Sequence, residues 1–199
     1  MTAANGPGYR LLIVGPPGAG KGTQAVRISK KFGIPAISTG DIFRENVRGE
    51  TELGVLAKSY MDRGEYVPDS VTNDLVADRL NWADADGGFL LDGFPRTTEQ
   101  VKTLDGILAT HSHALDAVIE LHAETEEVVE RLLKRAVEQG RTDDTEAVIR
   151  RRLEVYLEQT SPLIETYRER GLLLSINGLG DVDDVTARIF EALESRTAA

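Results

Sequence analysis

The chain has 199 residues, of which 41% are hydrophobic and 28% charged, so we expect one folded domain (1–199) with a full core and exclude a disordered chain. The absence of cysteine excludes disulfides, thiolate metal sites and a cysteine nucleophile, and it suits the reducing cytoplasm. The net charge of −10 argues against nucleic acid as a partner. The first apolar run, residues 11–14, is too short for a signal peptide or a membrane anchor, so we expect neither.

Short apolar runs recur along the chain, and helical patterns separate most of them. They are residues 10–14, a weaker run at 34–38, and then 88–91, 117–121 and 172–176. Each is too short for a typical buried helix, so we interpret them as strands. Strands that alternate with helices favour a parallel sheet covered on both faces. The sequence therefore predicts an α/β fold, a doubly wound parallel five-stranded sheet with helices on both faces.

Two segments do not fit simple alternation of strands and helices. Residues 38–67 contain two short amphipathic stretches broken by Gly49 and Gly64, which predicts a small helical insertion. Residues 134–144 resemble a short polar loop that contains Gly140. Segments of this kind on a rigid parallel sheet are common places for function.

The second half of the chain has two longer helical patterns. Residues 124–138 have apolar residues at helical spacing, and another pattern runs from residue 144 until Pro162 kinks or restarts it. Basic residues gather between Arg131 and Arg152. This cluster indicates a site for a small polyanion, and ion pairing on a helix surface is the alternative interpretation.

A glycine-rich segment follows the first strand and opens a helical stretch. Residues 15–23 read GPPGAGKGT and fit the pattern G-x-x-x-x-G-K at the strand–loop–helix position where this motif binds phosphate. The glycines let backbone N–H groups close around phosphate oxygens at a helix N-terminus, and Lys21 would reach the β- and γ-phosphates. Because the context fits, we disfavour a plain glycine turn.

The segment departs from the general motif in one place. Gly22 follows the lysine, so Thr23 comes one position late for the hydroxyl that normally binds Mg²⁺ directly. Asp92 ends the strand at 88–91 and is the acidic residue expected on the metal side, although aspartate also often begins a turn. With the phosphate-binding loop present, we favour a metal role for Asp92.

Three blocks carry a resemblance to one family. They are residues 15–24 (GPPGAGKGTQ), 38–44 (STGDIFR) and 91–97 (LDGFPRT). In this order and spacing they resemble the adenylate kinases, within the nucleoside monophosphate kinases of the P-loop fold. A fourth match, residues 140–144 (GRTDD) followed by three arginines at 150–152, extends the resemblance over nearly the whole chain.

The resemblance implies reversible, Mg²⁺-dependent, in-line phosphoryl transfer, ATP + AMP = 2 ADP. Such a transfer needs positioning and charge neutralisation more than a covalent nucleophile, which suits a site of Gly, Lys, Arg and Asp. It also implies a monomer with an AMP-binding segment at 38–67 and a lid at 134–144. The core would comprise residues 1–37, 68–133 and 145–199. Because the lid is of the short form, we expect no zinc.

On the acceptor side the resemblance implies a set of AMP contacts. The residues are Thr39, Arg44, Glu65, Tyr66, Val67, Gly93, Phe94, Pro95, Arg96, Gln100, Arg141 and Arg152. Arg44 and Arg96 would hold the α-phosphate, because guanidinium forks match planar oxyanions better than lysine does. Gln100 would read adenine, since an amide can both donate and accept. The alternative for Gln100 is a capping box with Thr97.

The strongest indication of the acceptor is Thr39. In the resemblance, threonine here is typical of adenylate kinases, whereas the UMP/CMP kinases usually have alanine. Thr39 therefore favours AMP over a pyrimidine nucleotide. The alternative is that Ser38 and Thr39 cap the following helix.

On the donor side the resemblance implies a second set of contacts. The residues that would hold ATP are Gly18, Ala19, Gly20, Lys21, Gly22, Thr23, Arg131, Arg135 and Gly180. Those implied in catalysis are Lys21, Arg96, Arg135, Arg141 and Arg152. Arg141 and Arg152 would span both nucleotides and neutralise charge on the transferred phosphoryl group. Helical geometry does not choose between Arg150 and Arg152, and the family pattern chooses Arg152.

Two other functions remain as alternatives. One is a kinase for CMP or UMP, and the other is an ATP-binding regulatory protein without turnover. The second is disfavoured because a non-catalytic module could lose its acceptor-side arginines without penalty.

Overall fold

A computed structural model describes residues 8–139 and 145–197 of the chain. Its sheet consists of β1 (Arg10–Val14), β2 (Ala36–Ser38), β3 (Phe89–Asp92), β4 (Ala117–His122) and β5 (Leu173–Asn177). The strands run parallel in the order β2-β3-β1-β4-β5. The predicted five-stranded parallel sheet is thereby confirmed.

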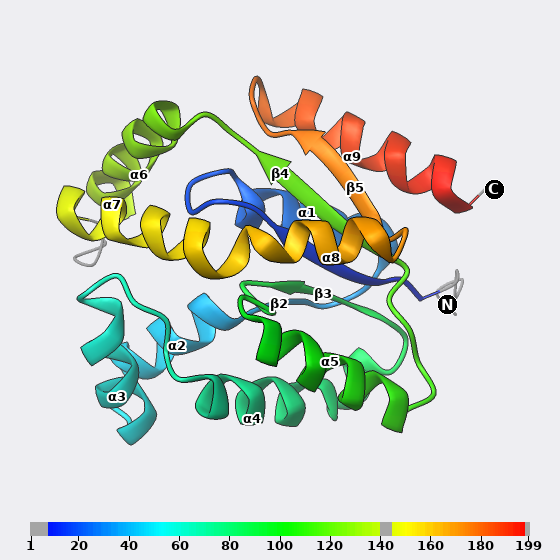
Figure 1. Cartoon of the computed structure of the whole chain (residues 1–199), viewed down its shortest axis with the longest axis horizontal. Helices are drawn as coiled ribbons and strands as arrows, with labels where there is room; N and C mark the ends of the chain where they lie inside the picture. The colour runs from blue at the N-terminus through cyan, green and yellow to red at the C-terminus, as the bar shows by residue number, and fades with distance from the viewer. Residues whose placement is uncertain (1–7, 140–144, 198–199) are drawn as a thin grey trace.

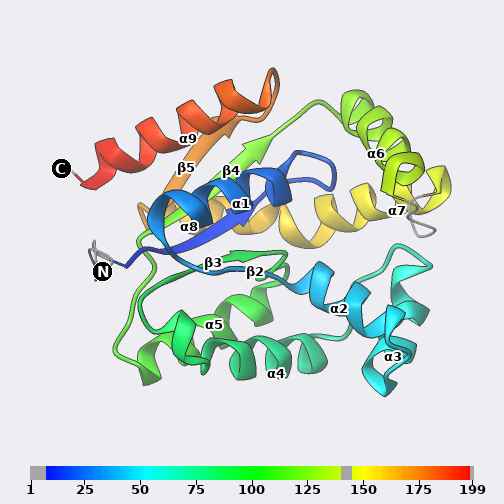
Figure 2. The same cartoon turned by 180° about the vertical axis from the view of Figure 1, so that it is seen from behind.

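Helices cover both faces of this sheet (Figures 1 and 2). They are α1 (Lys21–Phe32), α2 (Thr39–Arg48), α3 (Glu52–Met61), α4 (Asp69–Leu80), α5 (Thr98–Thr110), α6 (Thr125–Gln139), α7 (Glu146–Val155), α8 (Pro162–Glu169) and α9 (Val182–Thr197), with a 3₁₀ turn at Ala83–Ala85. Within the described residues, no helix is both long and apolar enough to cross a membrane.

Alternate residues of β1 enter two different cores, which is why the strand is apolar throughout. Leu12 and Val14 face the core formed with α4, α5 and α8. Leu11 and Ile13 face the opposite core, formed with α1 and α9. A strand buried on both faces needs an unbroken apolar run. The doubly wound arrangement is confirmed.

The topology places one edge of the sheet for ligand binding. β1 and β3 are neighbours, yet β1 is followed by α1 on one face and β3 by α5 on the other. In doubly wound folds, ligands bind beyond the carboxyl ends of strands whose connections diverge in this way. Helices α2, α3, α6 and α7 lie beyond the same ends (Figure 1).

The helical insertion forms as predicted, and its parts pack against one another in a small core of their own. Phe43 of α2, Ala57 of α3 and Val67 are buried against one another. The helix breaks lie at Gly49, which caps α2, and after Met61.

Helix α6 agrees with the helical pattern predicted at 124–138, but it overlaps the segment expected as a polar loop. Residues 134–139, expected in the polar loop, continue the helix to Gln139. Lysine, arginine, alanine, glutamate and glutamine in this stretch are good helix formers, so polarity alone did not mark a loop. The remaining part of the expected lid, 140–144, lies outside the described residues.

Pro162 restarts the long helical pattern as predicted. It opens α8, and a segment of π-helix, Tyr156–Thr160, joins α8 to α7. The wider turn of this segment brings Tyr156 and Thr160 to the carboxyl edge of the sheet, where both line the cavity described next.

Candidate functional site

A cavity of about 800 Å³ opens at the carboxyl ends of the strands. Of the residues expected to bind nucleotides, it is lined by Gly18, Ala19, Gly20, Lys21, Gly22, Thr23, Thr39, Arg44, Glu65, Tyr66, Val67, Asp92, Gly93, Pro95, Arg96, Gln100, Arg131, Arg135, Arg152 and Gly180. One space thus adjoins residues expected on the donor side and on the acceptor side.

The glycine-rich loop connects β1 to the N-terminus of α1. Gly15 has φ 147° there, and a Cβ on it would lie 2.3 Å from the Leu121 carbonyl oxygen, so only glycine fits. Lys21 Nζ donates to the carbonyl oxygens of Gly15, at 2.8 Å, and Pro16, at 2.9 Å. The lysine therefore lies folded along its own loop at the positive end of a helix.

Lys21 and Asp92 form the electrostatic centre of the cavity. Burial lowers the pKa of Lys21 to about 8, with Arg96 and Arg135 acting in the same direction and Asp92 opposing them. Burial raises the pKa of Asp92, and the nearby charges of Lys21 and Arg96 lower it. For Asp92 the first effect is the larger one. Concentrated positive charge of this kind suits a polyphosphate.

The start of α2 separates two roles that the sequence left open. Ser38 caps the helix, because its hydroxyl accepts from the backbone N–H of Asp41 at 3.3 Å. Thr39 instead donates its hydroxyl to the Gly93 carbonyl oxygen at 3.0 Å. Its side chain is therefore a fixed part of the acceptor-side wall rather than a cap.

Gly93 is the point where this wall is tightest. Its carbonyl also accepts from Arg96 Nε at 2.7 Å. The glycine has φ 83°, and a Cβ on it would lie 2.7 Å from Thr39 Oγ1 and 2.8 Å from Arg96 Nη2. Only glycine allows both side chains to approach this carbonyl.

Gln100 forms the capping interaction and also lines the cavity. Its backbone N–H donates to the Thr97 hydroxyl at 3.2 Å, and its side-chain oxygen accepts from the Arg96 N–H at 2.7 Å. Its amide nitrogen donates to Asp69 at 2.7 Å. One N–H and one lone pair of the amide remain beyond these bonds. The two interpretations of Gln100 are thus compatible, because the cap fixes the orientation of the amide.

Arg96 is held from two sides. Its guanidinium lies over the Tyr66 ring, 4.7 Å from the centroid. The Thr160 hydroxyl donates to the Arg96 carbonyl oxygen at 2.9 Å and lies 2.9 Å from the Tyr66 hydroxyl. Thr160 was not among the residues expected at the site, and it lies in the π-helical segment. Arg44, the other acceptor-side arginine, pairs with Asp41.

The cationic cluster divides between the cavity and the surface. Arg131, Arg135 and Arg152 line the cavity. Arg131 also pairs with Glu127 and donates to the Gly178 carbonyl oxygen. Three other members form ion pairs on helix surfaces, in the pairs Lys134–Glu138, Arg150–Glu146 and Arg151–Glu154. Both interpretations of the cluster thus hold for different members, and Arg152 rather than Arg150 lines the cavity.

Among the described residues, one expected residue, Phe94, is not brought to the cavity wall. Phe94 is 1% exposed and packs into the core under the sheet, so its side chain supports the wall from behind. Arg141 lies outside the described residues. Conversely, Gly178 and Tyr156 line the cavity, although neither was among the residues expected at the site.

Comparison with known proteins decides the family. The family model for adenylate kinase matches residues 13–172, most of the chain. The chain belongs to the adenylate kinase family. Similar proteins include the adenylate kinases of Leifsonia xyli subsp. xyli, 63% identical over 94% of this chain and 94% of that protein, and of Nocardioides sp., 62% identical over 93% and 97%. That of Pseudarthrobacter chlorophenolicus is 58% identical over 96% and 99%. The resemblance found in the motifs is confirmed.

Proposed function

We propose that the protein catalyses reversible phosphoryl transfer from ATP to AMP, giving two ADP. The observation that carries this proposal is the single cavity, which the phosphate-binding loop and the acceptor-side arginines line together. Family membership supports the same reaction. Two anionic substrates held in one space can react directly, without a covalent enzyme intermediate.

Each wall has a distinct task in this mechanism. The N-terminus of α1 and Lys21 would hold the ATP phosphates, because residues 18–23 line the cavity and N–H groups at a helix N-terminus favour anions. Arg44 and Arg96 would hold the α-phosphate of AMP. Arg135 and Arg152 would neutralise charge that develops on the transferred phosphoryl group, with Arg141 joining them. Positioning of this kind accounts for most of the catalysis in phosphoryl transfer.

Magnesium would enter with ATP, and the residues present fit that arrangement. Among the described residues, no group of three or more His, Cys, Asp or Glu side chains could hold a metal by itself. The carboxylate of Asp92 faces the loop, with Oδ2 3.9 Å from the position of a Cβ on Gly22. Mg²⁺ commonly keeps several waters and binds through one or two carboxylates and the substrate phosphates. Asp92 would orient such waters, and the metal would neutralise phosphate charge.

Two segments of the chain would close over the nucleotides. Residues 38–67 would close over AMP, the segment at 134–144 would close over ATP, and the rest would form the core. Closure would exclude water, which otherwise competes as the phosphate acceptor. We further propose that the protein is cytoplasmic, which the absence of cysteine supports, and that it acts on free nucleotides rather than nucleic acid, which the net charge of −10 supports. The proposal that it is a monomer rests on family membership alone.

Initial rates of ADP formation from Mg·ATP test the proposal, with AMP, CMP, UMP, GMP or no acceptor. We expect formation only with AMP, and a loss of about 10²–10³-fold in Arg96→Ala. Arg168→Ala is the matched control, because Arg168 pairs with Glu165 on the exposed surface of α8. Preference for a pyrimidine nucleotide would contradict the choice of AMP. ATP binding without ADP formation would contradict the proposal that the protein is an enzyme.

A further inference from the structure

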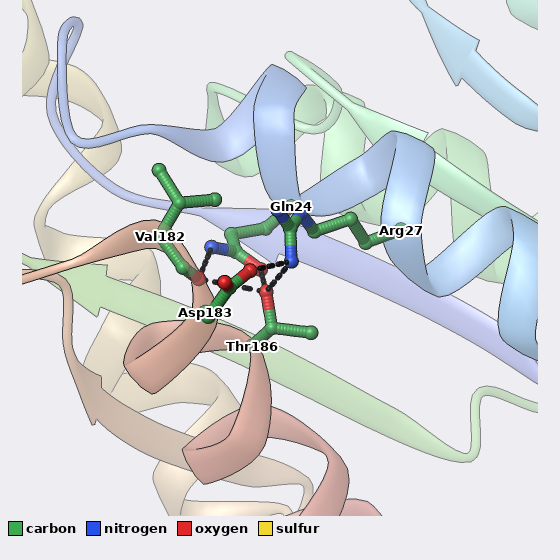
Figure 3. Close-up of polar contacts among 5 residues, drawn as sticks. All are labelled: Gln24, Arg27, Val182, Asp183 and Thr186. Atoms are coloured by element: carbon green, nitrogen blue, oxygen red, sulfur yellow. Dashed lines mark hydrogen bonds and ion pairs between the residues drawn. The ribbon is translucent and has the colours of Figure 1, made fainter.

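A polar cluster joins the first turn of α1 to the first turn of α9 (Figure 3). Gln24 is 3% exposed, and its amide nitrogen donates to the Val182 carbonyl oxygen at 3.1 Å. Its amide oxygen lies 2.8 Å from the Thr186 hydroxyl, which donates to it. These two residues are 162 positions apart in the chain.

Each member of the cluster makes at least one polar contact with another member. The Thr186 hydroxyl lies 2.8 Å from the Val182 carbonyl as well, so one proton serves two acceptors. Arg27 donates to the Thr186 oxygen at 3.3 Å and pairs with Asp183. Only one orientation of the Gln24 amide satisfies both of its partners. A buried polar network that is fully satisfied fixes its members in one arrangement.

The cluster lies at the border of the cavity. Gln24 is three residues beyond Lys21, and Val182 is two residues beyond Gly180. Both Gln24 and Val182 border the cavity. The cluster therefore ties the helix that follows the phosphate-binding loop to the helix that follows the loop at 178–181.

That second loop lies directly against the first. A Cβ on Gly178 would lie 3.3 Å from the Ala19 carbonyl oxygen and 3.1 Å from that of His122. On its other side, Arg188 donates to the carbonyl oxygens of Asn177, at 2.7 Å, and Leu179, at 2.9 Å. The loop is thus fixed at its base by Arg188 and at its exit by the Gln24–Thr186 pair.

We propose that Gln24 and Thr186 are positioning residues that set the spacing between the phosphate-binding loop and the loop at 178–181. The inference rests on the proposed function, in which the first loop holds the ATP phosphates, and it takes the second loop, where Gly180 is expected to contact ATP, to lie beside the adenosine part. A ligand that spans two subsites gains the affinity of both only when the spacing matches. Loosening the cluster will therefore weaken the binding of ATP, whereas the binding of a ligand that consists of phosphates alone will stay unchanged.

Thr186→Val tests this, because valine keeps the shape and removes the hydroxyl. We expect the Kd for ATP, measured by calorimetry, to rise about five- to tenfold, as for loss of a buried hydrogen bond. The Kd for inorganic tripolyphosphate should change by less than about twofold, as should the KM for AMP. Thr186→Ser, which retains the hydroxyl, should restore ATP binding.

The matched control is Thr110→Val in α5. Thr110 makes the same bond to the carbonyl four residues earlier, at 3.0 Å from Gly106, on an exposed surface. It should leave both ligands unaffected. Gln24→Met offers a second route to the same loss and should give the same pattern if Thr186→Val does not fold.

Two results would overturn the inference. One is an ATP Kd in Thr186→Val and Gln24→Met within twofold of the wild-type value. The other is an equal weakening of ATP and tripolyphosphate, which would mean that the whole site loosens. Failure of the proposed function is distinguishable from both, since it would appear as absence of AMP-dependent ADP formation in the wild-type protein.

Discussion

Raising the pH through 8 should weaken ATP binding through Lys21. In the free protein, burial lowers the pKa of this lysine to about 8. Phosphate charge in the complex favours the charged form and so raises the pKa. At pH 9 roughly a tenth of Lys21 stays charged, against about nine-tenths at pH 7. If only the charged form binds well, the Kd for ATP rises about tenfold over this range.

Calorimetry at pH 7, 8 and 9, in two buffers with different ionisation enthalpies, measures both the affinity and the protons taken up. We expect an uptake that approaches one proton per ATP at pH 9 and little uptake at pH 7. Lys21→Met should remove the tenfold dependence and leave only titrations of the nucleotide itself. A flat profile in the wild-type protein, or the same profile in Lys21→Met, would refute the reasoning.

Three further changes test other parts of the structure. Gly93→Ala places a Cβ 2.8 Å from Arg96 Nη2 at a residue with φ 83°. The free energy of unfolding, measured in urea, should therefore fall by about 1–3 kcal/mol. An unchanged free energy of unfolding would contradict this. Tyr66→Phe keeps the ring under the Arg96 guanidinium, so the KM for AMP should rise less than about threefold. Tyr66→Ala removes the ring and should raise this KM about tenfold. Equal effects of the two substitutions would show that the ring contact does not contribute to AMP binding. Burial, with the neighbouring charge of Arg10, lowers the pKa of His113 below 6.5. The unfolded chain therefore binds this proton at a higher pH than the folded one, and stability should fall as the pH drops below 6.5. Urea midpoints at pH 7.5 and 5.5 should show a smaller drop in His113→Gln than in the wild-type protein.

The sheet and the phosphate-binding loop were predictable because local sequence encodes them. Leu11–Val14 must be apolar throughout to fill two cores, and Gly15 must be glycine to pass the Leu121 carbonyl. Such requirements act between near neighbours or on one strand. They leave a pattern that periodicity and motif spacing detect.

Other parts of the site depend on packing over long distances. Thr160 bonds to Arg96 from a π-helical segment just before Pro162, 64 positions away in the chain. Gln24 and Thr186 meet only because α1 and α9 cover the same face of the sheet. The helical pattern at 124–138 predicted α6 to within a residue or two, but the polar loop expected from residue 134 overlapped it, because charged residues favour helix as readily as loop. A local sequence pattern does not indicate where two helices cross or which turn of a helix is wider.

The central claim is that two nucleotides react directly within one cavity. The most direct test uses ATP whose γ-phosphorus is made chiral with oxygen isotopes and one sulfur atom. The configuration at this phosphorus is compared before and after transfer to AMP. One in-line displacement inverts the configuration, whereas passage through a phosphorylated side chain inverts it twice and so retains it. We predict inversion in the ADP formed from AMP. Retention of configuration would contradict direct transfer.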